Sequence, residues 1–122
     1  MRALIVDDSR FIRQHMRQLL ERIGLTCDEA TNGREALQTL RDSAPFDFML
    51  VDVNMPQMNG LECVKALRDA GQNPLMKVMM VTTEADNSFI SRALEYGADE
   101  FLMKPFTPES LREKLVMLGL AS

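Results

Sequence analysis

Short apolar runs alternate with segments of helical spacing along the chain, and this alternation restricts the fold more than any other feature of the sequence. Apolar runs at residues 4–6, 48–51, 78–81 and 101–103, with a weaker one at 26–30, have the length of β-strands. Between them, apolar residues recur three or four positions apart, which is the period of an amphipathic helix. The run at 48–51 is apolar throughout, as expected for a strand covered on both faces.

Residues that begin and end helices flank these helical segments. Asn32 can cap a helix that has Glu35 at its third position, and Thr107 can cap one that begins at Pro108. Three segments are followed by a glycine, the residue that most often ends a helix: Gly24, Gly71 and Gly97. These signals support the helices that the spacing predicts.

Five strands alternating with five helices predict an α/β fold, a doubly wound parallel sheet with helices on both faces. Parallel neighbours need crossover connections, and such connections are right-handed. A chain of 122 residues has the usual size of one domain. Ligands of such sheets bind beyond the carboxyl ends of the strands, so the functional residues should directly follow the strands.

The composition argues against several classes of function. The formal net charge is −4, opposite in sign to the basic surface through which proteins bind nucleic-acid phosphates. The apolar run at 3–6 is far too short to span a membrane or to serve as a signal peptide. Cys27 and Cys63 have no C-x-x-C spacing and His15 is remote from both, which argues against zinc. We expect a cytoplasmic protein that binds neither nucleic acid nor membrane.

Charged and polar residues follow four of the predicted strands. They are Asp7 and Asp8 after the first strand, Asp52 at the end of the third, Thr82 after the fourth and Lys104 after the fifth. Two carboxylates about 4 Å apart repel each other by about 4 kcal/mol at an effective dielectric constant of 20. Three acids gathered at one edge of the sheet therefore predict a bound cation.

These residue types suit phosphoryl chemistry with a divalent cation. Mg²⁺ prefers oxygen ligands and is commonly held by one or two carboxylates together with a phosphate oxygen. A carboxylate such as Asp52 can act as a nucleophile toward phosphorus and form an aspartyl phosphate. The Lys104 ammonium would then neutralise charge on the phosphoryl oxygens, while the Thr82 hydroxyl would donate a hydrogen bond to one of them.

Several short motifs, spread over residues 3–118, together resemble the receiver domains of two-component response regulators. They are LIVDDS at 4–9, DVNMP at 52–56, Gly60, VT at 81–82, GA at 97–98 and KPF at 104–106. The resemblance is strongest to the single-domain chemotaxis regulators. It implies a flavodoxin-like sheet with strand order 2-1-3-4-5, and we expect residues 1–122 to form a single receiver domain without an output domain.

The resemblance also implies a metal site and a phosphoacceptor. Asp52 corresponds to the acceptor, which becomes 4-aspartylphosphate and also ligates the metal. Asp8 corresponds to the direct ligand of Mg²⁺, or of Mn²⁺ in its place. Asp7 corresponds to an acid that orients a metal-bound water. Asn54 corresponds to the residue whose backbone carbonyl completes the metal site and whose side chain influences hydrolysis of the phosphoryl group.

Further positions correspond to sensing and switching residues of the family. Thr82 and Lys104 correspond to the two sensors of the phosphoryl oxygens, and Glu84 shares the influence of Asn54 on hydrolysis. Thr83 stands where the family usually has a small residue, so we expect it to narrow access to the phosphoryl group. The aromatic residue that rotates inward on activation is Phe101, where the chemotaxis regulator has tyrosine, so any partner contact that needs the hydroxyl is in doubt.

As a receiver domain, the protein is expected to be a signalling switch and not an enzyme in the usual sense. A histidine kinase or phosphotransfer protein would supply the phosphoryl group, which the domain itself would help to hydrolyse. The target would be a protein that binds the surface formed by the fourth helix, fifth strand and fifth helix. We expect a monomer in a chemotaxis or phosphorelay role.

Two other functions use the same residues or the same fold. A phosphatase of the haloacid-dehalogenase type needs a nucleophilic aspartate, a second acid, a hydroxyl, a lysine and Mg²⁺. Its nucleophile follows the first strand in an Asp-x-Asp pattern, whereas the lone acid here ends the third predicted strand. An interaction domain that keeps the fold without phosphorylation is the other alternative, although every position needed for the chemistry holds a competent residue.

Overall fold

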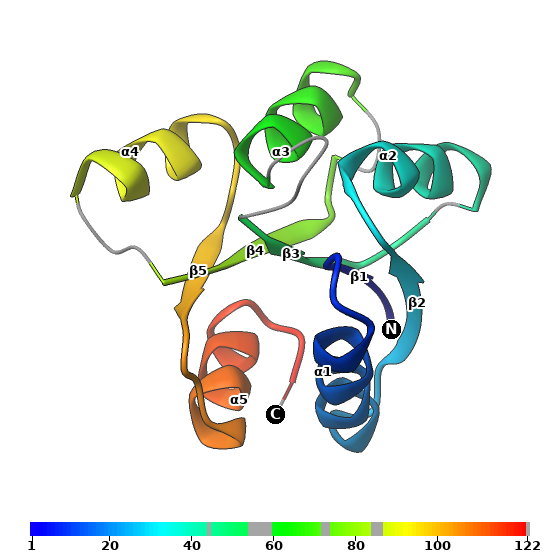
Figure 1. Cartoon of the computed structure of the whole chain (residues 1–122), viewed down its shortest axis with the longest axis vertical. Helices are drawn as coiled ribbons and strands as arrows, with labels where there is room; N and C mark the ends of the chain where they lie inside the picture. Colours follow the sequence, from blue (N-terminus) through cyan, green and yellow to red (C-terminus); the bar gives the residue numbers. More distant parts are fainter. Residues whose placement is uncertain (44, 54–59, 72–73, 84–86, 122) are drawn as a thin grey trace.

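The chain forms one five-stranded parallel sheet with helices on both faces (Figure 1). The computed structural model describes residues 1–43, 45–53, 60–71, 74–83 and 87–121, and only the backbone of 87–89. The elements are β1 (Arg2–Val6), α1 (Arg10–Ile23), β2 (Thr26–Ala30), α2 (Gly33–Asp42), β3 (Phe48–Asp52), α3 (Gly60–Asp69), β4 (Lys77–Thr82), α4 (Asn87–Glu95), β5 (Glu100–Met103) and α5 (Pro108–Met117). The strand order β2-β1-β3-β4-β5 confirms the predicted doubly wound α/β fold.

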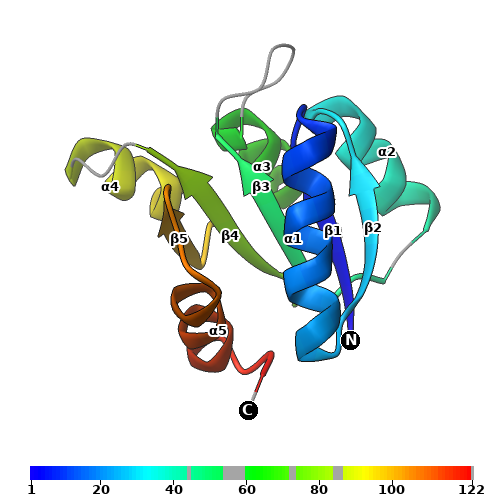
Figure 2. The same cartoon turned by 60° about the horizontal axis from the view of Figure 1, so that its bottom comes forward.

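Two apolar cores hold the helices against the sheet. Helices α1 and α5 cover one face, and α2, α3 and α4 cover the other (Figure 1). In the turned view, α1 runs alongside β1 and β2, which it contacts (Figure 2). The central strand β3 is buried over its whole length, as its continuous apolar run predicted. No helix in the described parts of the chain is long and apolar enough to cross a membrane.

The predicted helix ends are confirmed, with one difference in how α2 is capped. Asn32 accepts a hydrogen bond from the backbone N–H of Glu35 at 2.9 Å, as a helix cap does. The Glu35 carboxylate, however, accepts from the backbone N–H and the hydroxyl of Thr31 and not from the Asn32 backbone. Thr31, immediately before the cap, offers two hydrogen-bond donors, its backbone N–H and its hydroxyl, so the Glu35 carboxylate accepts from Thr31 instead.

Strand register brings the predicted site residues to one edge of the sheet. Val6 pairs with Val51, so the residues that follow them, Asp7 just after β1 and Asp52 at the end of β3, lie side by side at the same edge of the sheet. Asp52 in turn pairs with Val81 of β4, one residue before Thr82. The last residue of β5 pairs with Thr82, so that Lys104 follows at the same edge.

Gly60, the first residue of α3, packs closely against the end of β3. A Cβ atom at this position would lie 2.6 Å from the carbonyl oxygen of Asp52, 2.8 Å from Cα of Val53 and 2.9 Å from Cε of Met80. The Gly60 N–H also donates to the Val53 carbonyl at 2.9 Å. The glycine therefore lets α3 begin directly beside the backbone of Asp52.

We predict that Gly60→Ala destabilises the protein by about 1–3 kcal/mol, because backbone atoms of β3 must shift to admit the methyl group. Helix propensity alone would have the opposite effect, since alanine is favoured over glycine by up to about 1 kcal/mol. Urea unfolding of the two proteins measures the difference. An unchanged or increased free energy of unfolding would show that the close contacts at Gly60 do not matter.

Candidate metal and phosphoryl site

Three carboxylates meet at the carboxyl edge of the sheet. Asp7 and Asp8 come from the loop between β1 and α1, and Asp52 is the last residue of β3. One oxygen from each lies within 4.8 Å of the others. Asp7 is 1% exposed and Asp52 5% exposed, whereas Asp8 is exposed. Among the described residues, this is the one group of three or more His, Cys, Asp or Glu side chains close enough to hold an ion.

Hydrogen bonds hold Asp7 in place but leave one of its oxygens without a partner in the described part of the chain. The Asp7 backbone N–H donates to the carbonyl of Ala30 at 3.1 Å, and Oδ1 accepts from the Ser9 backbone N–H at 2.8 Å. The other carboxylate oxygen, Oδ2, is buried and has no hydrogen-bond partner among the described residues. A buried, unpaired carboxylate oxygen is costly unless a ligand satisfies it.

The raised pKa of Asp7 also indicates that this site gains from a bound cation. The pKa of its carboxyl is raised from the usual 3.8 to about 6. Burial is the main cause; the Ser9 hydrogen bond lowers the pKa, the charge of Asp52 raises it and the positive charge of Lys104 lowers it. Ionisation of Asp7 therefore costs more in the folded protein without a cation than it does in water. A divalent ion beside Oδ2 would relieve this cost.

Lys104 supplies a positive charge beside Asp52, the predicted acceptor. Its Nζ lies 3.3 Å from Oδ1 of Asp52, which is the contact expected of a lysine that would bind a phosphoryl oxygen there. The Lys104 backbone N–H donates to the Thr82 carbonyl at 2.8 Å, which ties the ends of β4 and β5 together. Thr82 itself is 1% exposed at the end of β4.

The donor set fits a hard cation such as Mg²⁺ better than zinc. All three converging side chains offer carboxylate oxygens, the ligands that Mg²⁺ prefers. The two cysteines are free and buried, and burial raises the pKa of the Cys27 thiol to about 11 and that of Cys63 to about 12. Protonated thiols make poor zinc ligands.

The structure gathers most of the residues that the sequence singled out. Those at the carboxyl edge of the sheet are Asp7, Asp8, Asp52, Thr82 and Lys104. Thr83 follows directly and is exposed. Asn54, with its backbone carbonyl, and Glu84 lie outside the described residues, so their predicted roles stay predictions.

Phe101, the predicted switch residue, lies on β5 under a charged pair that the sequence did not reveal. Its half-buried ring packs against the core on the α2–α4 face, and the Lys114 Nζ lies 5.2 Å from the ring centroid. Lys114 also pairs with Glu100 at 3.1 Å. The helical spacing placed Lys114 on α5, but only the packing of α5 beside β5 brings it over the ring.

We predict that Asp7→Asn stabilises the protein without metal at pH values above about 6, by about 1–3 kcal/mol. A carboxyl whose pKa is raised on folding binds more protons folded than unfolded, so the wild type loses stability as pH rises from about 3.8 to about 6. Asparagine has no such titration. Urea unfolding in chelator across this pH range should show the advantage of the variant growing and then levelling off.

The exposed acid Glu113 of α5 provides a control, and Glu113→Gln should change stability little at any pH. A constant difference between Asp7→Asn and wild type across the range would contradict a raised pKa at Asp7. Added Mg²⁺ should stabilise the wild type more than Asp7→Asn, because binding to the folded state alone adds to its stability.

Comparison with known proteins agrees with this geometry. The family model described as the response regulator receiver domain matches residues 3–116. The chain is 39% identical to chemotaxis protein CheY1 of Helicobacter pylori over 121 residues, 98% of each chain. It is 40% identical to the chemotaxis protein CheY homolog of Campylobacter jejuni over 116 residues, covering 94% of this chain and 89% of the relative.

The chain also resembles a solved structure in its fold. Chemotaxis protein CheY4 of Vibrio cholerae superposes with a TM-score of 0.89 at 39% identity, covering 96% of this chain and 97% of that protein. Sequence and fold therefore agree over nearly the whole length of the chain. The protein belongs to the family of response regulator receiver domains.

Proposed function

We propose that this receiver domain is a phosphorylation-controlled signalling switch that accepts a phosphoryl group on Asp52. The observation that carries the proposal is the position of Asp52, which is buried at the end of β3, within 4.8 Å of oxygens from Asp7 and Asp8 and 3.3 Å from the Lys104 ammonium. A nucleophilic carboxylate needs positive charge beside it when an anionic phosphoryl group arrives. Lys104 provides one positive charge at this site, and the carboxylates of Asp7 and Asp8 are suitable ligands for a metal cation that would provide another.

The chemistry is a single transfer of a phosphoryl group. A carboxylate oxygen of Asp52 attacks phosphorus of a phosphohistidine on the kinase or phosphotransfer protein, so an O–P bond forms as the N–P bond breaks. The imidazole leaves with the bond's electron pair and takes a proton from solvent. Lys104 holds a phosphoryl oxygen, and the Thr82 hydroxyl donates to another. Mg²⁺ held by Asp7 and Asp8 would supply the remaining charge compensation.

Hydrolysis of the phosphoryl group would end the signal. Water attacks phosphorus, the O–P bond to Asp52 breaks, and inorganic phosphate leaves, which regenerates the carboxylate. The domain would thus accept and lose one phosphoryl group per cycle and would not turn over phosphate esters, which separates it from a haloacid-dehalogenase phosphatase. This difference in turnover is the basis for a test.

The output would pass from the site to the surface formed by α4, β5 and α5. The hydrogen bond from the Lys104 backbone to Thr82 couples the ends of β4 and β5, and Phe101 lies on β5 with Lys114 of α5 over its ring. A phosphoryl group that draws Thr82 and Lys104 inward would therefore move the strand that carries Phe101. The domain would have two packings of similar energy. The charge of the phosphoryl group would favour one of them, and the target protein would bind that packing.

The relatives favour a chemotaxis role over other signalling roles. Several relatives are named chemotaxis proteins, and the likeness to them covers nearly the whole chain. We propose a cytoplasmic monomer that receives its phosphoryl group from a histidine kinase or phosphotransfer protein. Its target would be another protein and neither nucleic acid nor membrane, in keeping with the net charge of −4.

We predict that acetyl phosphate with Mg²⁺ adds one phosphoryl group to the wild type and none to Asp52→Asn. Intact-protein mass spectrometry measures the addition, and beryllofluoride binding provides a second readout. Asp47→Asn is a matched control, because this acid directly precedes β3 at the other end of the strand and should leave phosphorylation intact. Phosphorylation of Asp52→Asn, or sustained turnover of a phosphate ester, would contradict the proposal.

We also predict that Thr83→Ala shortens the lifetime of the phosphoryl group and speeds reaction with acetyl phosphate. Thr83 is exposed and directly follows Thr82, so its β-branched side chain would restrict the approach of water and of small donors. Loss of phosphoryl mass after removal of the donor gives the lifetime. Thr83→Ser, which keeps the hydroxyl and removes the methyl, should be intermediate, and equal lifetimes in all three proteins would refute the steric account.

A further inference from the structure

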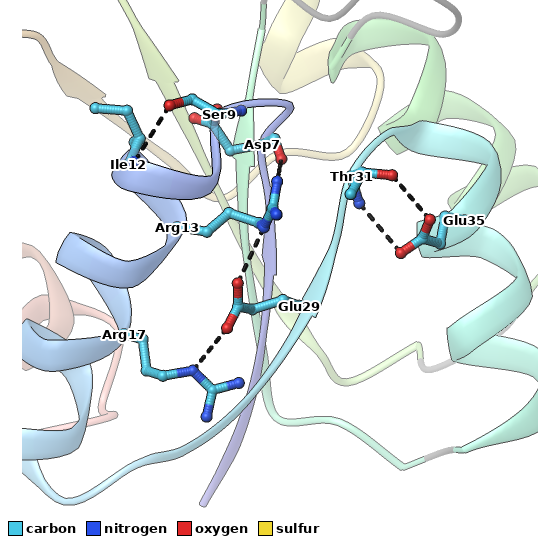
Figure 3. Close-up of polar contacts among 8 residues, drawn as sticks. All are labelled: Asp7, Ser9, Ile12, Arg13, Arg17, Glu29, Thr31 and Glu35. Carbon is cyan, nitrogen blue, oxygen red and sulfur yellow. Dashed lines mark hydrogen bonds and ion pairs between the residues drawn. The ribbon is translucent and has the colours of Figure 1, made fainter.

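Arg13 of α1 makes a direct contact with the backbone of the acidic site. Its Nη1 donates to the carbonyl oxygen of Asp7 at 2.6 Å, and its side chain is only 11% exposed (Figure 3). Helical side chains point back toward the N-terminus of their helix, so a residue in the second turn of α1 can reach the residue that precedes the helix. Arg13 thus contacts the loop that carries Asp7 and Asp8.

Glu29 of β2 holds Arg13 in this position. One Glu29 carboxylate oxygen lies 2.9 Å from Nε of Arg13, and the other lies 2.8 Å from Nε of Arg17 (Figure 3). The Arg13 guanidinium therefore bridges two elements, with Nε bound to β2 and Nη1 bound to the end of β1. A guanidinium suits this task because its donors are fixed in one plane, unlike the single donor group of lysine.

Asp7 is consequently held at three points. Its backbone N–H bonds to Ala30 of β2, its carbonyl accepts from Arg13, and Oδ1 accepts from the Ser9 N–H. Two of these contacts depend on neighbouring residues of β2, Glu29 and Ala30. The oxygen left over is Oδ2, which is buried without a partner among the described residues, and the Asp7 carboxylate belongs to the acidic group.

We infer that Arg13 is a positioning residue for the cation site. Held by Glu29, it fixes the Asp7 carbonyl and so directs the Asp7 carboxylate toward the space shared with Asp8 and Asp52. The inference rests on the proposed function, because it needs a divalent cation to bind among these carboxylates. Groups that orient metal ligands in this way contribute to affinity without touching the metal.

A purely structural role and a purely electrostatic role for Arg13 make different predictions. If Arg13 only joined α1 to β2, the Arg17–Glu29 pair would do the same, and the contact with Asp7 would be incidental. If the charge of Arg13 were what mattered, its removal would strengthen cation binding, because a positive group near the site repels a cation. Positioning predicts that removal weakens binding.

The experiment compares Arg13→Gln with its matched control Arg17→Gln. Both variants remove one positive charge from the same glutamate, but Arg13 alone contacts the Asp7 carbonyl. Calorimetric titration with Mg²⁺ alone, well above the pKa of Asp7, gives the dissociation constants, and urea unfolding in chelator gives the stabilities. We expect Arg13→Gln to weaken Mg²⁺ binding about tenfold and Arg17→Gln to leave it nearly unchanged.

A second readout needs no metal. Hydrogen exchange at the Ser9 amide, which donates to Asp7 Oδ1, should accelerate in Arg13→Gln and not in Arg17→Gln. If Arg13→Gln does not fold, Arg13→Lys takes its place. Lysine keeps the charge but offers one donor group for two partners, so we expect weaker Mg²⁺ binding there as well.

The outcomes separate failure of this inference from failure of the proposed function. Mg²⁺ binding by Arg13→Gln that is equal to or tighter than by Arg17→Gln would overturn the positioning role and leave the proposed function standing. A wild type that binds no Mg²⁺ would overturn both. Weaker binding in Arg13→Gln and Arg17→Gln alike would assign the effect to the ion pairs with Glu29 and would also overturn the role.

Discussion

Repulsion among carboxylates at one edge of a parallel sheet is the constraint on which the rest of this molecule depends. The register of β1, β3 and β4 brings Asp7 and Asp52 to the same level, and burial removes much of the water that would screen them. The pKa of Asp7 is raised mainly by burial and in part by the charge of Asp52, and its Oδ2 has no hydrogen-bond partner among the described residues. The positive charge of Lys104 offsets part of this repulsion, and a bound cation would offset more of it. In the proposed function, an anionic phosphoryl group would then interact with both the cation and Lys104.

The elements beside the site hold it from two directions. On one side, β2 contacts the Asp7 loop directly through Ala30 and indirectly through Glu29 and Arg13. On the other side, the backbone hydrogen bond between Lys104 and Thr82 joins the ends of β4 and β5. In the proposals made above, the first set of contacts would orient metal ligands, whereas the second lies between Asp52 and the surface that carries Phe101. The two sides of one sheet edge would then serve binding and response separately.

Much of this candidate site could be predicted because its residues end strands or directly follow them. Asp52 ends a continuous apolar run, and Lys104 follows another, so topology alone assigned both to one edge. Arg13 and Glu29 carry no such signal. An arginine in a charged helix and a glutamate in a weak strand are ordinary surface residues until α1 packs on β2 and brings them together. The position of Lys114 over the ring of Phe101 could not be predicted for the same reason.

By itself, the sequence determined the order of strands and helices, the helix ends at residues such as Gly24 and Thr107, and the set of side chains at the carboxyl edge. These follow from local periodicity, from capping chemistry and from the topology of parallel sheets, all of which act within or between successive elements. Only the tertiary structure decided which oxygen of Asp7 has no partner among the residues described, how the Asp7 carbonyl is held, and which charged group lies over Phe101. Those features depend on contacts between side chains of packed elements, which no spacing along the chain encodes.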